Sequence, residues 1–470
     1  MNQPPADVGM VGLGTMGGNL VLNLVDHGFT VAGLDRSNER LRALQTAAPP
    51  SRIVGDADPR AFVRLLKPPR AIFVLVPAGA AVDEVIAQLA PLLASGDLLV
   101  DAGNSHFRDT DRRSAELAAR GLHFFGMGVS GGEQGARYGP SLMPGGPRAA
   151  YERIRGVLDA VAAKVNGEPC AEWLGNGAAG HYVKMVHNGI EYGLMQLIAE
   201  TYDVLRRLAG LSNDALQRTF AEWNEGELAS FLVEITAKVF SQRDAKTSRH
   251  LVDVILDVAQ QKGTGQWTSQ EALALRVPTP NIDAAVAMRV LSGRREIRQK
   301  ARELYPAAEN AAPDPGLAAA ARGALYVASV LAYGQGLALL RAASKAHGYD
   351  LQLEQVVKVW RGGCIIRAAL LEDIRAAYRR DADLPDLVID PALGAKVAPR
   401  VADLRSVVQA AIGAGLAVPG LSAALGYVDA LRAARLPLNL VQAQRDYFGA
   451  HTYERIDEPG VFHTHWGASA

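Results

Sequence analysis

The chain has 470 residues, a hydrophobic fraction of 49%, and 49 basic side chains balanced by 49 acidic ones. This length predicts two or three domains, and the zero net charge gives no general attraction to nucleic acid or to an anionic membrane. Because only Cys170 and Cys364 are present and neither a leader nor a membrane-spanning run is seen, we expect a cytoplasmic protein with two buried, reduced cysteines.

The first 177 residues alternate short β-type runs with helical patterns such as those at 19–27 and 81–93. Such alternation indicates βαβ units and a mainly parallel sheet. We therefore predict an α/β N-terminal domain over residues 1–177. The expected strands are Val8–Val11, Thr30–Leu34, Ala71–Val76, Leu98–Val100 and Leu122–Phe125.

A G-x-G-x-x-G motif, Gly12–Gly17, follows the first strand and opens a helix. Glycines there allow a tight turn and let a pyrophosphate approach the helix N-terminus, where free N–H groups favour anions. Plain turn glycines are the alternative. The context predicts a Rossmann-type dinucleotide site.

Asp35 ends the second expected strand and bears on which dinucleotide binds. A carboxylate there accepts hydrogen bonds from an adenosine 2′-hydroxyl and repels a 2′-phosphate. Arg36 and Ser37, however, are suited to bind that phosphate. Both cofactors therefore stay open, as does the alternative that Asp35 only caps the next helix.

Two further loops follow strands on the expected cofactor side. Asn104 has an amide suited to orient a nicotinamide or a substrate hydroxyl, or to close an Asx-turn. Ser130, Gly131 and Gly132 offer a hydroxyl and backbone N–H groups to a carboxylate or phosphate, although a plain tight turn is equally consistent.

The segment from Lys184 to Tyr192 carries the densest polar chemistry. At helical spacing Lys184, His187, Asn188 and Glu191 share one face, with Tyr192 beside them. A base and an acid two turns apart, roughly 10 Å along the axis, can flank a small substrate. A solvated face with a Lys–Glu pairing is the alternative.

From residue 178 strands largely vanish, and we predict an all-helical domain over 178–437 followed by an extended tail over 438–470. A diverged repeat about 140 residues apart relates His181 and Trp223 to Leu325 and Trp360. The second copy lacks the polar stripe, so folding does not require it there. The positions matching the stripe are Ala328, Leu331, Ala332 and Gln335.

Several other segments are less regular. The Ala/Pro-rich stretch from Pro306 to Pro315 is expected to be a loop within the helical part. Lys262 and Thr264 offer a cation and a hydroxyl on another loop. No Cys or carboxylate set accompanies His463 and His465 in the tail, so we expect no metal site.

Together these motifs resemble 6-phosphogluconate dehydrogenase, the decarboxylating enzyme of the pentose phosphate pathway and of gluconate utilization. The resemblance runs over nearly the whole chain. It rests on the segments Asp101–Ser105, Gly128–Glu133, Gly135–Gly146, His181–Tyr192, Lys262–Gly265, Trp360–Arg367 and Gln442–Tyr453.

The resemblance implies conversion of 6-phosphogluconate to ribulose 5-phosphate and CO2. Lys184 would be the general base for C3 oxidation and Glu191 the acid that protonates C1. Because free lysine has a pKa near 10.4, the site must lower it by desolvation or a neighbouring cation. His187, Asn188 and Asn104 would orient the substrate, with Asn104 bridging to the nicotinamide.

The resemblance also implies two ends of a substrate site. Ser130, Gly131 and Gly132 would bind near the carboxylate. The phosphate end would be formed by Tyr192, Lys262, Thr264, Arg289 and Arg445. In relatives the tail enters the neighbouring subunit, which implies a homodimer in which Arg445 and His451 complete the partner's site.

The implied cofactor is NADP or NAD. NADP-dependent relatives usually have Asn where this chain has Asp35 and often Lys where it has Pro77, and both changes favour NAD or dual use. Gly14 replaces a usual Ala. The expected cofactor contacts are Gly12, Leu13, Gly14, Thr15, Met16, Gly17, Asp35, Arg36, Ser37, Val76, Pro77, Ala78 and Asn104.

Two other functions compete with this interpretation. A 3-hydroxyisobutyrate-type dehydrogenase shares a Rossmann domain and a helix-borne lysine, but such chains are shorter and lack the second helical half, the Lys262 loop and the tail. A catalytically silent dinucleotide-binding protein would not need Lys184 and Glu191.

Overall fold

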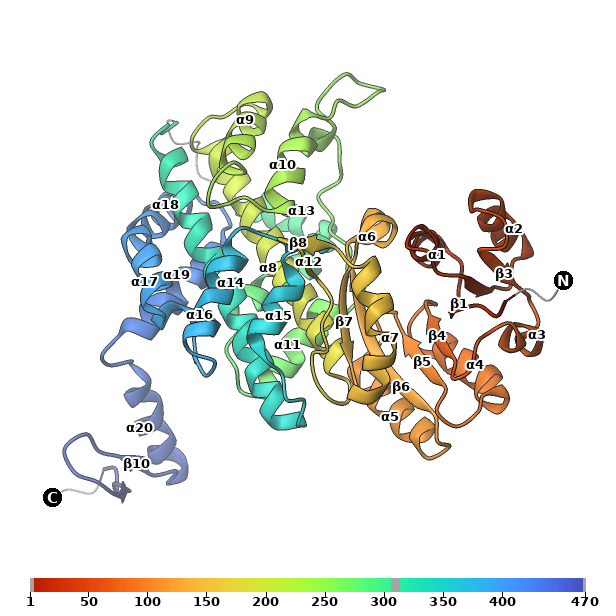
Figure 1. The fold of residues 1–470 in the computed structure, drawn as a ribbon. Helices are drawn as coiled ribbons and strands as arrows, with labels where there is room; N and C mark the ends of the chain where they lie inside the picture. Colours follow the sequence, from red (N-terminus) through yellow and green to blue (C-terminus); the bar gives the residue numbers. More distant parts are fainter. Residues whose placement is uncertain (1–3, 306–312, 468–470) are drawn as a thin grey trace. The chain divides into compact units, whose positions relative to one another are not determined.

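The computed structural model describes residues 4–305 and 313–467. Contacts within the chain define two compact units, Met1–Ala424 and Leu425–Ala470. The first unit contains a sheet with flanking helices and a set of long helices (Figure 1). The predicted domain boundaries after residues 177 and 437 stay predictions, and most of the Pro306–Pro315 stretch lies outside the described residues.

The sheet has seven strands in the order β3-β2-β1-β4-β5-β6-β7. The first six strands in this order pair in parallel, and β7 runs antiparallel to β6. Strands β1, β2, β4 and β5 are buried throughout, as parallel strands covered on both faces are. The bounds are β1 Val8–Val11, β2 Val31–Leu34, β3 Ile53–Gly55, β4 Ala71–Val74, β5 Leu98–Asp101, β6 His123–Ser130 and β7 Ser141–Gly145.

The predicted α/β fold is confirmed, with two strands that the sequence did not reveal. Strand β3 has only three residues, and β7 contains Pro144 and Gly145, which are unusual in strands. Proline is tolerated in β7 because it is an edge strand. Two apolar clusters fill the sheet's two sides. The flanking helices are α1 Thr15–Asp26, α2 Asn38–Ala47, α3 Pro59–Arg64, α4 Ala80–Leu89, α5 Phe107–Ala118, α6 Gly132–Tyr138 and α7 Arg148–Val161.

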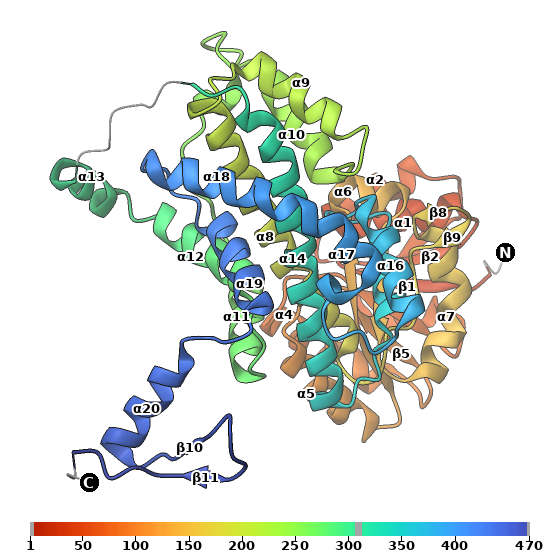
Figure 2. The same cartoon turned by 90° about the vertical axis from the view of Figure 1, so that its left-hand side faces the viewer.

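Two long helices, α8 (Ala179–Arg207) and α14 (Leu317–His347), form the centre of the helical part (Figure 2). A Cβ on Gly336 would lie 2.5 Å from the Ile190 side chain, so the two helices approach closely. Helix α14 is long and apolar enough to cross a membrane, but 89% of its most apolar window is buried inside the protein, as in a core helix.

Shorter helices make up the rest of the helical part. Their bounds are α9 Asn213–Trp223, α10 Phe231–Ser241, α11 Thr264–Ala274, α12 Pro280–Ser292, α13 Arg295–Leu304, α15 Leu353–Trp360, α16 Leu370–Arg380, α17 Pro391–Val397, α18 Val401–Gly413 and α19 Pro419–Arg432, the last of which crosses the boundary between the two units. Short 3-10 turns occur at Ala90–Leu92, Leu251–Asp253, Leu387–Ile389 and Ala398–Arg400.

The described elements fit the internal repeat. In each copy a long helix is followed by a short one that ends on a tryptophan, Trp223 in α9 and Trp360 in α15. An antiparallel bridge then joins Ser230 to Ala368 at nearly matching positions. Gln335, the counterpart of Glu191, is fully buried and donates to Asn281 Oδ1 at 2.7 Å. The second copy therefore uses this position for packing.

Helix α8 meets the sheet through glycines. A Cβ on Gly180 would lie 2.4 Å from Gly126 O and 2.7 Å from Gly145 N, and one on Gly128 would lie 2.4 Å from Lys184 Cβ. Such distances leave no room for side chains between the helix and strands β6 and β7. The first turns of α8 are thereby fixed against the carboxyl-terminal half of β6.

In the first unit, two further short strands, β8 (Lys164–Val165) and β9 (Glu168–Pro169), pair with each other. The second unit contains helix α20 (Leu438–Gly449) and a hairpin of β10 (Tyr453–Glu454) and β11 (Val461–Phe462). The buried Asp446 accepts hydrogen bonds from Thr452 N, Thr464 N and Trp466 Nε1. The expectation of an extended tail without a helix is therefore wrong for Leu438–Gly449.

Candidate functional site

Lys184 lies at the centre of a buried polar group on α8. Its side chain is 7% exposed, and Nζ donates to Asn188 Oδ1 at 2.7 Å and to Ser130 Oγ at 3.4 Å. Burial lowers the pKa of Lys184, and the carboxylate of Glu191 opposes this shift. The structure thus supplies the desolvation that a lysine base requires.

His187 is fully buried beside Lys184. Its Nε2 lies 3.3 Å from Ser130 Oγ, and its Nδ1 lies 3.0 Å from Asn188 Oδ1. Burial and the neighbouring Lys184 hold the pKa of His187 well below its usual value. A neutral ring with the proton on Nδ1 donates to Asn188 and accepts from Ser130.

Glu191 lies one turn further along α8 and is partly exposed. Its Oε2 is 3.8 Å from His187 Nδ1. Burial raises the pKa of Glu191, against the opposing effects of Lys184 and Arg289. The predicted stripe therefore combines a lysine biased toward its neutral form with a glutamic acid biased toward its protonated form, as a base and acid pair requires. The purely solvated face is excluded.

Tyr192 begins a second cluster next to Glu191. The Arg289 guanidinium carbon lies 3.5 Å from the Tyr192 ring centroid, and Arg289 Nη1 donates to Gln260 O at 3.0 Å. Gly265 packs against the same ring, and Thr264 is the first residue of α11. Lys262 is exposed on the loop just before that helix. These residues come from three separate segments, namely α8, α12 and the loop that leads into α11.

Ser130 ends β6, and Gly131, with φ of +112°, is the N-cap residue of α6. A Cβ on Gly131 would lie 2.5 Å from Gly363 O, so the Trp360–Arg367 segment supports this loop. Cys364 in that segment is buried, and burial raises the pKa of its thiol to about 12. Cys170 is buried as well. The contact of Gly363 with Gly131 was not apparent from the residues' spacing.

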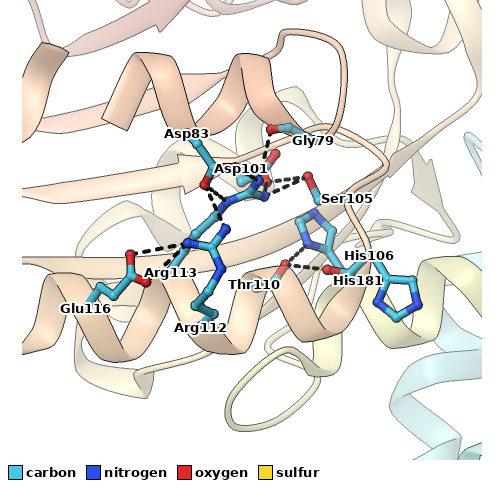
Figure 3. A network of polar contacts seen from close by, with 10 residues as sticks. All are labelled: Gly79, Asp83, Asp101, Ser105, His106, Thr110, Arg112, Arg113, Glu116 and His181. Atoms are coloured by element: carbon cyan, nitrogen blue, oxygen red, sulfur yellow. Dashed lines mark hydrogen bonds and ion pairs between the residues drawn. The ribbon is translucent and has the colours of Figure 1, made fainter. Parts of the chain in front are cut away.

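Asn104 is exposed in a loop whose shape is set by Asp101. The Asp101 carboxylate accepts from Gly103 N at 3.0 Å. It also accepts from Ser105 Oγ at 2.6 Å (Figure 3). The Asx-turn considered for Asn104 is therefore made by Asp101. Within the described parts of the chain, the Asn104 amide has no hydrogen-bond partner, and it stays available to a ligand.

A cavity of about 520 Å³ lies at the carboxyl ends of β1, β2 and β4. Its lining includes six predicted cofactor residues, together with the unpredicted Arg40, Ala57 and Gln88. The six are Gly12, Gly14, Asp35, Arg36, Val76 and Pro77. Leu13, Gly14 and Thr15 line an adjoining hollow, whereas the other predicted cofactor residues, Met16, Gly17, Ser37, Ala78 and Asn104, line neither.

The glycines of the Gly12–Gly17 loop differ in how much room each has for a side chain. Gly12 has φ of +91°, and a Cβ there would lie 2.4 Å from Leu75 O. A Cβ on Gly17 would lie 1.9 Å from Gly12 O. Around Gly14, by contrast, no heavy atom lies within 4 Å of the added Cβ. The loop therefore has the tight turn of a pyrophosphate-binding motif, with Gly14 free to vary.

Asp35 is held by the same loop. Its Oδ2 accepts from Leu13 N at 2.7 Å and its Oδ1 from Ser37 N at 2.8 Å, with Arg40 Nη1 at 3.6 Å. The residue that caps α2 is Ser37, whose hydroxyl accepts from Arg40 N. The capping alternative for Asp35 is thus wrong.

Arg445 and His451 belong to the second unit. Arg445 is exposed and donates to Gln442 Oε1 at 3.1 Å, and His451 is exposed beside the Phe448 ring. Their predicted roles stay predictions. Among residues 4–305 and 313–467, no group of three His, Cys, Asp or Glu side chains is arranged to hold a metal.

Comparison with known proteins gives matches over nearly the whole chain. The family model "6-phosphogluconate dehydrogenase, C-terminal domain" matches residues 180–466, and "NAD binding domain of 6-phosphogluconate dehydrogenase" matches residues 7–175. The NADP(+)-dependent, decarboxylating 6-phosphogluconate dehydrogenase of Bacillus subtilis is 48% identical, with 98% of each chain covered. A decarboxylating 6-phosphogluconate dehydrogenase of Spinacia oleracea is 46% identical at the same coverage.

A solved structure of a 6-phosphogluconate dehydrogenase also matches the chain over nearly its whole length. The 6-phosphogluconate dehydrogenase of Plasmodium falciparum, described in apo form and with NADP+ or 6-phosphogluconate, superposes with a TM-score of 0.94. It is 39% identical, and the match covers 98% of this chain and 100% of that one. The chain therefore belongs to the 6-phosphogluconate dehydrogenase family.

Proposed function

We propose that the protein catalyses the oxidative decarboxylation of 6-phospho-D-gluconate to D-ribulose 5-phosphate and CO2, with hydride transfer to NADP or NAD. The observation that carries this proposal is the pairing on α8 of a buried lysine of lowered pKa with a glutamic acid of raised pKa. The named activity of the Bacillus subtilis and Spinacia oleracea relatives supports the choice of substrate.

The residues of the cofactor cavity fit a dinucleotide. The turn at Gly12 and the first turn of α1 suit a pyrophosphate, and Val76 and Pro77 also line the cavity. When bound there, the nicotinamide ring supplies the acceptor for the hydride that leaves C3 of the substrate.

Lys184 Nζ takes the proton of the C3 hydroxyl in this scheme. Burial lowers the pKa of Lys184 and so favours the neutral amine, the form that acts as a base. The resulting ammonium then donates a hydrogen bond to the new C3 carbonyl oxygen. This polarisation lets the C1–C2 bond break as CO2 leaves. The electron pair of that bond forms a C2–C3 double bond, and the C3 oxygen takes the proton of the Lys184 ammonium to give the enediol.

Glu191 supplies a proton to the former C2 of the substrate, which becomes C1 and the hydroxymethyl group of the product. The C3 hydroxyl returns its proton to Lys184 and becomes the product's ketone. Burial raises the pKa of Glu191, which favours the protonated form that this step requires. We assign Ser130 and the Gly131–Gly132 loop to the substrate carboxylate, and Asn104, His187 and Asn188 to its hydroxyls. The phosphate is assigned to Tyr192, Lys262, Thr264 and Arg289, and to Arg445.

The surroundings of Asp35 favour use of both cofactors. Two N–H donors and the guanidinium of Arg40 already offset the carboxylate charge, and exposed Arg36 adds a cation at the cavity wall. These cations favour a 2′-phosphate, whereas Asp35 still accepts a hydrogen bond from a ribose hydroxyl. NADP dependence of the Bacillus subtilis relative supports NADP use.

We further propose a cytoplasmic homodimer in which Arg445 and His451 of the second unit complete the partner's substrate site. The exposed apolar side chains of this unit support the proposal, because they would need burial against another surface. They include Leu438, Leu440, Tyr447, Phe448 and Val461.

Initial rates with 6-phosphogluconate and each cofactor, with CO2 and the ketopentose phosphate quantified, test this function. We expect stoichiometric CO2 and reduced nucleotide, and kcat/KM values for NADP and NAD within about tenfold of each other. The Asp35→Asn variant should shift this ratio toward NADP. Lack of turnover with both nucleotides contradicts the activity, and a thousandfold preference for either contradicts dual use.

A further inference from the structure

A buried arginine outside the substrate site joins two of the loops described above. Arg113, in α5, has a side chain only 1% exposed. Its Nε and Nη2 donate to the two carboxylate oxygens of Asp83 at 2.8 and 2.9 Å, and Nη2 also donates to Gly79 O at 3.0 Å. Its Nη1 lies 3.4 Å from Ser105 Oγ and 3.5 Å from Asp101 Oδ2 (Figure 3).

These partners belong to two functional segments. Gly79 caps α4 and directly follows the segment whose Val76 and Pro77 line the cofactor cavity, and Asp83 lies in the first turn of that helix. Asp101 and Ser105 shape the loop that presents Asn104. One guanidinium therefore contacts the supports of the cofactor segment and of the Asn104 loop.

The same helix also contacts the lysine-bearing helix. Thr110, one turn before Arg113, has its Oγ1 2.6 Å from His181 Nδ1 (Figure 3). His181 lies one turn before Lys184 on α8. Helix α5 thus contacts the cofactor segment, the Asn104 loop and α8 through adjacent side chains of one face.

We propose that Arg113 is a positioning residue, which fixes the cofactor segment relative to the Asn104 loop so that the nicotinamide ring meets C3 of the substrate. This role rests on the proposed function. A planar guanidinium suits it because its N–H groups point in fixed directions, toward Asp83 and Gly79 on one side and Ser105 and Asp101 on the other. Packing alone would not need such a group, since apolar side chains fill buried space at lower desolvation cost.

The neighbouring Arg112 provides a matched control. It also binds Asp83, at 2.9 Å, but it is exposed and its other partner is Glu116 on α5 itself. The Arg112→Lys variant therefore alters an ion pair of the same carboxylate without contacting the Asn104 loop.

The first experiment compares Arg113→Lys and Arg112→Lys in the full-length enzyme. For Arg113→Lys we expect kcat to fall about ten- to hundredfold and the deuterium isotope effect with 3-deuterated 6-phosphogluconate to rise, while KM for that substrate changes less than about twofold. Arg112→Lys should leave all three near wild type. Equal effects of the two variants, or a fall in kcat with no change in the isotope effect, overturn the proposal.

A double-mutant cycle covers the case in which Arg113→Lys folds poorly. Asp83→Asn and Ser105→Ala affect the two sides of Arg113, and we expect their effects on NADPH affinity and on kcat to be non-additive while Arg113 is present. Additive effects on both quantities overturn the proposal. Because NADPH affinity does not depend on turnover, a wild-type enzyme inactive on 6-phosphogluconate would refute the proposed function while the cycle still tests Arg113.

Discussion

Lys184 Nζ donates to the Asn188 amide oxygen at 2.7 Å, within one turn of α8. The acceptor is neutral, so it orients the amine without the strong charge stabilisation that a carboxylate would give. Asn188→Asp should therefore raise the pKa of Lys184 and move the acidic limb of the pH profile of kcat/KM upward by about one unit or more. A limb that stays in place would show that another group controls it.

Removal of the amine tests the base itself. Lys184→Met fills similar space without a proton acceptor, and we expect kcat to fall by at least about a thousandfold. NADPH affinity, measured by fluorescence, should change little because the cofactor cavity is lined by other residues. Retained turnover would refute the role of Lys184.

Glu191 should control the alkaline limb of the pH profile of kcat/KM. Because its pKa is raised by burial and its protonated form is the donor, activity should decline as pH rises through that pKa. Glu191→Gln cannot donate, so kcat should fall about a hundredfold and the alkaline limb should disappear. An unchanged alkaline limb would assign the final protonation to a different group.

Two glycines of the cofactor loop should respond oppositely to alanine. Gly14→Ala enters open space, and KM for the nucleotide should stay within about twofold of wild type. Gly12→Ala places a Cβ 2.4 Å from Leu75 O at a φ of +91°, and KM should rise at least about tenfold. Similar values for both variants would show that the turn is not tight.

Glu168 on β9 joins the sheet-bearing part to α15 and α16 through Arg361 and Arg375, whose guanidinium groups lie 2.6 Å from its carboxylate. Hydrogen bonds from both lower the pKa of Glu168 to about 2. Because folding lowers the pKa of Glu168, its ionised carboxylate stabilises the fold. This contribution is complete above the ordinary carboxyl pKa of 4.5 and is lost as pH falls through about 2.

Glu168→Gln should therefore destabilise the protein at pH 7 by about 1 kcal/mol, a value discounted for solvent screening because the side chain is 41% exposed. The difference in denaturation midpoint should shrink below pH 4.5. Glu116→Gln, at a more exposed pair with Arg112, is the control and should have a smaller effect at every pH.

Local periodicity was enough to predict the part of the site that lies on one helix. The contacts of Lys184 with His187 and Asn188 follow from helical spacing, as the turn at Gly12 follows from its motif. Ser130 lies 54 residues from Lys184 in the sequence, and the Gly363 support of Gly131 is more distant still. Such contacts depend on tertiary packing, which spacing does not encode.

Helix α20 was not predicted because its sequence carries no buried apolar face. Predictable helices bury one apolar face, which produces a 3.6-residue period. In Leu438–Gly449 the only buried residue is Asp446, and Leu438, Leu440 and Tyr447 are exposed. The hydrogen bond from Leu13 N to the Asp35 carboxylate could not be predicted either, because it joins residues 22 positions apart in the sequence.

The glycine contacts of α8 with the sheet have a consequence for motion. Packed elements slide past one another by changing side-chain rotamers in the layer between them. Between Gly180 and the backbones of Gly126 and Gly145 there is no such layer, so α8 cannot shear across β6 and β7. Lys184 on α8 and Ser130 at the end of β6 therefore keep their relative positions when the surrounding elements move.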